Sequence, residues 1–358
     1  MSRAARPTLN VATLQDVARV AGVSPATVSR VINDDKNVRA TTRDKVNDAV
    51  RELNYVPNLA ARSLASAAQV RLGVIYSNPS AAYLSAFLLG AMDECAARGG
   101  ELLLVRCEAG DEDSERAAIT RLMDSAVSGV LLPSPRTQAS VLGQMLADVG
   151  LPTVTIGSGG SPDAFSRVHV DDQVAAWEMT RHLLDLGHRR IGFIKGHPSL
   201  QSSHARAQGF AEAMAETPCA TALEAQGFFT FSSALAAAEE LLGHADRPTA
   251  IFASNDDMAA AVVSVAHRRG LDVPGDLTVV GFDDTQIAVT LWPPLTTVRQ
   301  PMGEMAAAAI DLLMREIRLA RAGQPSEPLD HVVPHVLVRR QSSSPPLFAP
   351  QALAVGAR

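Results

Sequence analysis

The chain has 358 residues, of which 47% are hydrophobic and 20% charged, a composition typical of a globular protein with two or three domains. No apolar run reaches the ~18–20 residues that a membrane-spanning helix needs, and no apolar signal-peptide core follows Arg3 and Arg6. The three cysteines, Cys95, Cys107 and Cys219, are too widely spaced for a disulfide framework or a zinc site. We therefore expect a cytoplasmic protein with reduced thiols, no metal or other cofactor, and no membrane contact.

The net charge of −6 is unevenly distributed along the chain. Residues 1–69 hold ten Lys and Arg against six Asp and Glu, whereas the remaining residues hold 22 against 32. A basic end on an acidic protein favours contact between that end and a polyanion. Because a solvated surface can have the same balance, the charge alone does not select DNA binding.

Short helices are expected to fill the first 57 residues. Apolar residues at three- and four-residue spacing predict these helices: Leu14–Ala21, Pro25–Asn33 and Thr42–Leu53. Thr13 and Asp16 have the spacing of a capping box, Gly22 ends the first helix, and Ser24 caps the second before Pro25. Helix, tight turn and helix form the helix-turn-helix pattern, although a plain three-helix bundle has the same periodicity.

The start of the second helix would enter the major groove of DNA. Its exposed N-terminal positions are Pro25, Ala26, Ser29 and Arg30. Arg30 can bond guanine through two hydrogen bonds, whereas Ala26 can only touch a thymine methyl or pack. Further candidates, which would hold phosphates through hydroxyls and helix-start N–H groups, are Thr13, Ser24 and Thr27.

Beyond Val70, short β-rich runs alternate with helical stretches, a pattern that predicts parallel sheets covered on both faces and two α/β lobes. The predicted strands are Arg71–Ser77, Glu101–Arg106, Gly129–Pro133, Thr153–Ile156, Val168–Val170, Arg190–Lys195, Ala250–Ala253 and Thr278–Gly281. The predicted helices are Leu84–Ala97, Glu115–Ser125, Val174–Leu186, Ala205–Ala215, Ser233–Leu242, Met258–Arg269 and Met302–Arg321.

Polar clusters follow three of these strands, at Asn78, at Asn255 and at Asp283. In open parallel sheets, ligands bind beyond the carboxyl ends of the strands, and Asp and Asn suit a ligand rich in hydroxyls. The same residue types also cap the helix that follows, so each cluster alone has a structural explanation.

The sequence TLQDVARVAGVSPATVSRVIN, followed by NVRATTRDKVNDAVRELNYVPNLAARSLA, closely resembles the headpiece of the lactose-repressor-like (LacI/GalR) regulators. The resemblance extends over almost the whole chain. It implies an all-α helix-turn-helix headpiece and an α/β two-lobed effector domain like the type I periplasmic binding proteins. The implied segments are a headpiece in 1–57, a hinge helix or linker in 58–69, and an effector-binding and dimerisation domain in 70–340.

Within the effector domain, the N-lobe is expected in about 70–168 and 298–328, and the C-lobe in about 169–297 and 329–340. The tail 341–358, rich in Ser and Pro, is expected to be disordered. It lacks a leucine heptad, so nothing there predicts a coiled-coil tetramer.

The resemblance also implies roles for individual residues in DNA binding. Family residues at the positions of Pro25, Ala26 and Arg30 read bases in the major groove. Residues that help position the DNA backbone match Thr13, Ser24, Thr27, Ser29, Asn33 and Tyr55. One departure is Arg39, which stands where the family usually has a capping serine; Thr41, with Asp44 three residues on, is expected to cap the third helix instead.

The stretch from Asn58 to Leu64 matches the family's hinge helix. By resemblance, two such helices pair across a dimer and enter the minor groove, where a leucine matching Leu64 wedges into the central base step. The small side chains of Ala60 and Ala61 would permit this close helix approach. A helix this short is marginal alone, so it is expected to order only with two subunits and DNA in place. An ordinary polar linker is the alternative.

In the effector domain, the resemblance implies ligand contacts from Arg206, Asn255 and Asp283, with an aromatic ring at Phe229. Two further candidates, Asn78 and Tyr83, are expected to face the cleft from the other lobe. Gly157 replaces a polar side chain of some sugar-binding members, which argues against a simple transfer of their specificity. The run Gly157–Gly160 has no phosphate-loop spacing and is interpreted as a loop.

These features together predict a homodimeric repressor that binds a near-palindromic operator and is controlled by a small effector, expected to be a sugar or sugar derivative. One alternative is a DNA-binding regulator without an effector, whose α/β domain only dimerises. A transport-type binding protein or an enzyme is a third possibility; the absence of a GxSxG motif or of histidines at metal spacing counts against catalysis.

Overall fold

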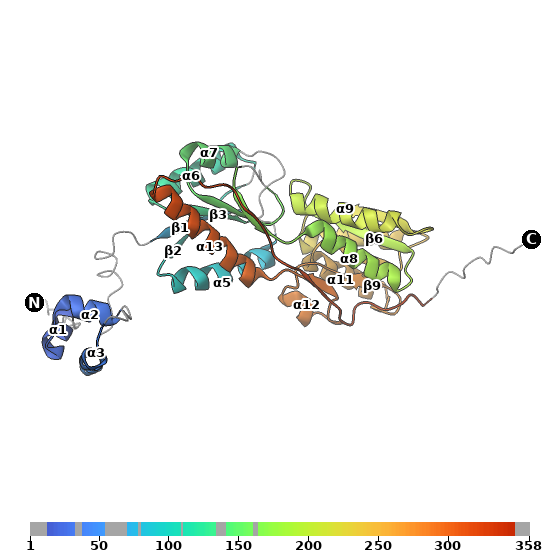
Figure 1. Ribbon diagram of the computed structural model, residues 1–358. Helices are drawn as coiled ribbons and strands as arrows, with labels where there is room; N and C mark the ends of the chain where they lie inside the picture. Colours follow the sequence, from blue (N-terminus) through green and yellow to red (C-terminus); the bar gives the residue numbers. More distant parts are fainter. Residues whose placement is uncertain are drawn as a thin grey trace, which may run out of the picture. The chain divides into compact units, whose positions relative to one another are not determined.

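The computed structural model describes residues 13–32, 38–53, 70–77, 80–108, 110–133, 141–159 and 164–347. By its internal contacts the chain divides into two compact units, Met1–Gln69 and Val70–Arg358. Figure 1 shows the helices of the first unit and the two lobes of the second. No helix in the described ranges is long and apolar enough to cross a membrane.

The first unit contains three helices, α1 (Leu14–Ala21), α2 (Pro25–Ile32) and α3 (Ala40–Glu52). Thr13 caps α1, and both bonds of its capping box with Asp16 are present. Gly22 ends α1 at φ +66°, in the left-handed region that glycine adopts without steric cost. The helix-turn-helix pattern predicted from the sequence is therefore confirmed.

Valines and alanines from all three helices form the core of this unit. Val17, Val28 and Val46 are fully buried there, and Ala18, Val31 and Ala49 are nearly so. The start of α3 differs from the expectation, because the helix begins at Ala40 behind Arg39, which makes no side-chain cap bond. Thr41 therefore lies inside the helix and is not its cap.

In the second unit, the N-lobe contains a six-stranded parallel sheet in the order β11-β5-β4-β3-β1-β2. Its strands are β1 (Arg71–Tyr76), β2 (Glu101–Arg106), β3 (Gly129–Pro133), β4 (Thr153–Ile156), β5 (Ser166–His169) and β11 (Asp330–Val332). The helices are α5 (Ala81–Ala97), α6 (Glu112–Asp124), α7 (Val141–Val149) and α13 (Met302–Arg321).

The two faces of this sheet have separate apolar cores. Leu72 and Val74 of β1 pack with α5 and α13, whereas Ile75 packs with α6 and α7. Neighbouring residues of a strand point to opposite faces, so a continuous apolar run is needed to bury both. Figure 1 shows α5 and α13 side by side.

The C-lobe contains a four-stranded parallel sheet in the order β7-β6-β8-β9. The strands are β6 (Arg190–Lys195), β7 (Thr221–Gln226), β8 (Ala250–Ala253) and β9 (Thr278–Val280). One face carries α8 (Asp172–Asp185) and α9 (Gln201–Ala215), and the other α10 (Phe231–Gly243) and α11 (Asp256–Arg268). Phe193 of β6 stacks on Phe210 of α9, with ring centroids 4.6 Å apart.

The chain passes between the lobes after β5, after β10 (Thr297–Arg299) and after β11. The expected assignment of residues 329–340 to the C-lobe is wrong for β11, which pairs with β5 at the edge of the N-lobe sheet. Asp330 accepts two hydrogen bonds from Arg167, at 2.9 and 2.8 Å, which explains this placement. Next along the chain, β12 (Val336–Val338) pairs antiparallel with β10.

The expected disorder of the C-terminal tail does not hold for residues 341–347, which pack on the C-lobe. Ser342 is fully buried, and its hydroxyl donates to the Val279 carbonyl at 2.5 Å and accepts from the Thr296 amide at 2.8 Å. The Val279 amide donates to the Ser342 carbonyl at 2.9 Å. The segment therefore satisfies backbone groups at the open edge of the sheet, as an added strand would.

Candidate functional site

The predicted DNA-reading residues of α2 lie on its outer side. Val28 and Val31 point into the core of the first unit, and Pro25, Ala26 and Arg30 are exposed. This face is therefore free to enter a groove, as the helix-turn-helix hypothesis requires.

The hydroxyls expected to hold phosphates lie at the starts of α1 and α2. Thr13 and Ser24 are exposed, and the Ser24 hydroxyl is 2.9 Å from that of Thr27 and accepts from the Thr27 amide at 3.2 Å. These hydroxyls already cap the helix starts, so a phosphate would meet them in a fixed geometry.

The candidates that lie outside the described residues are Asn33, Tyr55, Asn58, Ala61, Leu64 and Asn78. For Ser29, the helical backbone is described and the side chain is not. The hinge and these residues stay predictions.

In the second unit, a polar cavity lies where the carboxyl ends of strands from both lobes face each other. About 30 Å³ of it is accessible to water-sized molecules. The lining residues are Ser80, Tyr83, Gly157, Ser158, Asp172, Leu200, Ser202, Arg206, Phe229, Asn255, Asp283 and Gln300. A sugar ring needs far more room, so binding it requires the lobes or the lining side chains to move.

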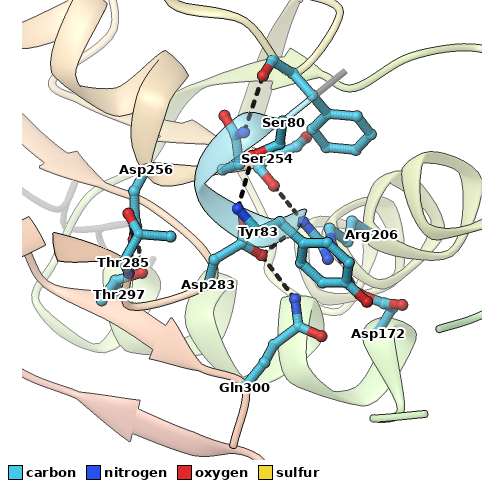
Figure 2. Close-up of polar contacts among 12 residues, drawn as sticks. Ser80, Tyr83, Asp172, Arg206, Ser254, Asp256, Asp283, Thr285, Thr297 and Gln300 are labelled. Atoms are coloured by element: carbon cyan, nitrogen blue, oxygen red, sulfur yellow. Dashed lines mark hydrogen bonds and ion pairs between the residues drawn. The ribbon is translucent and has the colours of Figure 1, made fainter. Parts of the chain in front are cut away.

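Arg206 of α9 is the centre of the cavity wall (Figure 2) and is 4% exposed. Its Nε donates to Asp172 Oδ1 at 2.7 Å, and its Nη1 donates to the Ser254 carbonyl at 2.5 Å and lies 3.6 Å from Asp283 Oδ1. The guanidinium also lies over the Phe282 ring, 3.6 Å from its centroid. Burial alone lowers the pKa of Arg206, but Asp172 and Asp283 raise it above its ordinary value, so the cation is retained.

Asp283 lines the cavity and lies beside β10, the strand after which the chain passes to the N-lobe. Gln300, just after β10, donates to Asp283 Oδ1 at 2.7 Å. The backbone of Asp283 adopts φ +110°, which is strained for any residue other than glycine. Burial raises the pKa of Asp283 to about 7, and the neighbouring Arg206 opposes this rise. Near pH 7, both the charged and the neutral form of the Asp283 carboxyl are therefore populated.

Asp256, at the start of α11, is a second buried carboxyl behind the cavity. Thr297 donates its hydroxyl to Oδ1 at 2.6 Å, and Thr285 donates its amide to Oδ2 at 2.7 Å and its hydroxyl at 3.1 Å. Burial, reinforced by Asp283, raises the pKa of Asp256 to about 8. The residue therefore ties α11 to a strand that crosses between the lobes.

Asn255 and Phe229 hold each other in place. Asn255 caps α11 through the Met258 amide at 3.0 Å, and its Nδ2 donates to the Phe229 carbonyl at 3.1 Å. Phe229 is 5% exposed and has φ +62°. Both expected effector residues line the cavity, and Asn255 is also a helix cap, so the two interpretations of its sequence position are compatible.

Direct hydrogen bonds join the lobes across the cavity. Ser158 of the N-lobe donates to Asp172 Oδ2 at 2.5 Å, and Ser80, the cap of α5, donates to Asp257 Oδ2 at 3.5 Å. Tyr83, predicted to face the cleft, lines the cavity and is 6% exposed. A ligand with hydroxyls that replace these bonds would change the relation of the lobes.

Sequence reasoning missed Asp172, Ser158 and Gln300. Asp172 comes two residues after the predicted strand Val168–Val170, so the rule that located Asn255 and Asp283 could also have found it. Ser158 belongs to the glycine-rich run that we interpret as a loop, and that loop in fact contributes to the cavity. No local sequence pattern marks Gln300 as a site residue. It reaches Asp283 only because the chain returns past the cavity along β10 on its way to the N-lobe. Within the described ranges, no group of three or more His, Cys, Asp or Glu could hold a metal ion.

The two buried carboxyls predict a pH dependence of stability. Their folded pKa values, about 8 for Asp256 and about 7 for Asp283, lie above the ordinary 3.8, so above pH ~4 the folded state binds more protons than the unfolded state. The free energy of unfolding should therefore fall as the pH rises from about 4 to about 8. Asp256→Asn should flatten this fall by up to roughly 1 kcal/mol per pH unit.

Urea unfolding of the wild type and of Asp256→Asn between pH 5 and 8 measures this difference. Both tryptophans, Trp177 and Trp292, belong to the C-lobe, so their fluorescence reports on the lobe that contains Asp256. Equal pH slopes for the two proteins would mean that Asp256 titrates at its ordinary value when folded.

Family models match both units of the chain. Residues 13–58 match the bacterial regulatory proteins of the lacI family, and residues 180–343 match the periplasmic binding protein-like domain. The chain is 35% identical to the HTH-type transcriptional regulator GalR of Salmonella typhimurium, over 94% of this chain and 97% of the relative. It is 33% identical to the HTH-type transcriptional repressor PurR of Photobacterium profundum, over 86% of this chain and 92% of the relative.

Solved structures give the same result. The complex of the transcriptional regulator CelR with cellobiose has a TM-score of 0.70 at 32% identity, over 92% of this chain and 99% of that one. The lac repressor dimer bound to operator and the anti-inducer ONPF has a TM-score of 0.71 at 28% identity, over 94% and 100%. The exposed helix-turn-helix face, the polar cavity and these matches show that the chain belongs to the LacI family of bacterial regulatory proteins.

Proposed function

We propose that this DNA-binding transcriptional regulator is a cytoplasmic repressor that binds a near-palindromic operator as a homodimer and is controlled by a sugar-like effector. The observation that carries the proposal is the presence on one chain of an exposed helix-turn-helix face and a polar, two-lobed cavity. Two-fold symmetry of a dimer would match the symmetry of the operator.

The proposed base-reading residues are Pro25, Ala26 and Arg30, and backbone contacts come from Thr13, Ser24, Thr27, Ser29, Asn33 and Tyr55. The hinge would add Asn58, Ala61 and Leu64. The proposed effector contacts are Asn78, Tyr83, Arg206, Phe229, Asn255 and Asp283, to which the geometry adds Asp172. The titles of two solved relatives, one with cellobiose and one with operator DNA, support both classes of partner.

The cavity suits an uncharged polyol better than an anion. Its cation, Arg206, is paired with Asp172 and lies near Asp283, so the described lining has no unpaired positive charge for a phosphate or carboxylate. Carboxylate and amide groups instead accept and donate to hydroxyls. We propose regulation rather than catalysis, because the cavity's polar groups pair with one another and with capped helix ends.

Arg30→Ala tests the headpiece assignment. Loss of a two-bond contact to guanine should cost about 1–3 kcal/mol on the preferred DNA site and relax base choice at one position per half-site. Binding to random duplex should change much less, because phosphate contacts remain. Titration of labelled duplexes at one fixed salt concentration gives both affinities. An equal loss on both duplexes would reassign Arg30 to a phosphate contact.

Effector-independent regulation is the competing function. It predicts that no sugar changes operator affinity, although the α/β unit still dimerises. Operator titration with and without each sugar of a panel separates the two, because a ligand shifts DNA binding only if its affinity differs between the two states.

A further inference from the structure

Two aromatic rings lie on the loops that lead from the strands of the C-lobe toward the cavity. His197 follows β6 and Phe228 follows β7, and their rings meet edge to face, with centroids 5.6 Å apart and planes at 73°. We call this pair the aromatic platform. Phe228 is 41% exposed although it already packs on another ring, so water covers a large apolar surface there.

The loops that carry the aromatic platform also border the cavity. β6 and β7 pair up to Lys195 and Gln226, and the next residue of the first loop, Gly196, lies against the Phe229 ring. A Cβ on Gly196 would come within 2.1 Å of that ring, so the two loops pack without a gap. Phe229 lines the cavity and Phe228 precedes it.

Hydrogen bonds fix both loops before any ligand arrives. The Ser199 amide and hydroxyl lie 3.2 and 2.8 Å from His197 Nδ1, and the Leu200 amide donates to the His197 carbonyl at 3.1 Å. Gln226 Nε2 donates to the Gly196 carbonyl at 2.6 Å and to the Gly227 carbonyl at 3.0 Å. A fixed aromatic surface loses little conformational entropy on binding.

We propose, resting on the proposed effector function, that the aromatic platform is an outer subsite for the second ring of a disaccharide or glycoside. The first ring occupies the polar cavity, where Arg206, Asp283 and Asn255 meet its hydroxyls. The second ring lies with its C–H face on Phe228, because the apolar faces of a pyranose pack on aromatic rings while its hydroxyls stay in water. Occupation of the platform therefore selects a two-ring effector over its monosaccharide.

Calorimetry with the full chain tests the subsite with D-glucose, D-galactose, cellobiose, maltose and lactose as probes. We expect a disaccharide to bind more tightly than the monosaccharide of its non-reducing end. Phe228→Ala should weaken the disaccharide about three- to tenfold and leave the monosaccharide unchanged. Phe231→Ala is a matched control, because Phe231 begins α10 three residues after Phe228, is 42% exposed, and has no ring partner among the described residues.

Each contrary result has its own meaning. Equal affinities for one- and two-ring sugars, with no effect of Phe228→Ala, would overturn the subsite and leave the effector function standing. Equal losses for both alanine variants would also overturn it. A change in sedimentation of Phe228→Ala without a change in sugar affinity would assign the platform to a protein interface. If no sugar binds the wild type at about 10 mM, the sugar-effector proposal itself is contradicted.

Discussion

Replacing Arg206 by alanine is expected to lower the free energy of unfolding by about 3–5 kcal/mol and to abolish effector binding. The substitution removes the partner of Asp172, 3% exposed, and of Asp283, 7% exposed, and leaves the Ser254 carbonyl without its donor. Buried charges that lose their partner are costly because water cannot replace it. Urea unfolding followed by tryptophan fluorescence measures the change in the C-lobe.

Arg190→Ala is the control for this substitution. Its side chain is exposed on β6 and, among the described residues, donates one bond, to the Arg247 carbonyl at 3.0 Å, so the cost should stay below about 1 kcal/mol. If Arg206→Ala were no more costly than Arg190→Ala, the carboxyls around Arg206 would be neutral in the folded protein and the ion-pair description would be wrong.

The second large effect is expected for Gly209→Ala. Gly209 of α9 faces α8 so closely that a Cβ would lie 2.0 Å from the Gln173 carbonyl oxygen and 2.9 Å from the Trp177 amide nitrogen. Backbone atoms cannot move aside as side chains do, so the helices must separate, at a cost of about 3 kcal/mol or more. Because Asp172 is on α8 and Arg206 on α9, the separation should also weaken effector binding.

Gly303→Ala provides the matched comparison. Gly303 lies in α13, has no positive φ, and has nothing within 4 Å of an added Cβ. Alanine there should stabilise the protein by about 0.4–1 kcal/mol, since it restricts the unfolded chain. Circular dichroism during urea unfolding follows both variants. A Gly209→Ala protein as stable as Gly303→Ala would show that the contact between α8 and α9 is not close-packed.

Local sequence signals were sufficient for the elements that bury residues on both faces. Ile191–Ile194 and Gly129–Pro133 are continuous apolar runs, and the structure has the strands Arg190–Lys195 and Gly129–Pro133 with the predicted bounds. β7 was missed because Thr221–Gln226 is an edge strand with mostly exposed residues and no apolar run. β11 was missed for the same reason, since all of its residues are exposed and its pairing depends on the distant Arg167.

The candidate site was predictable where strand ends carry polar residues, as at Asn255 and Asp283. The resemblance to a known family selected Arg206 and Phe229, whose own positions on a helix and a loop give no local sign of a cavity. Asp172 and Gln300 join the site through contacts between segments far apart in sequence, which no local pattern contains. The aromatic platform likewise depends on two loops that lie about 30 residues apart in the chain.

The central claim is that the chain reads a symmetric DNA site as a dimer. Selection of bound duplexes from a random-sequence library by the full chain, at about 0.15 M salt, tests it most directly. The account predicts a near-palindrome with a deformable central step between two half-sites. Enrichment of no symmetric sequence would contradict it, and would leave the headpiece as a non-specific DNA-binding unit.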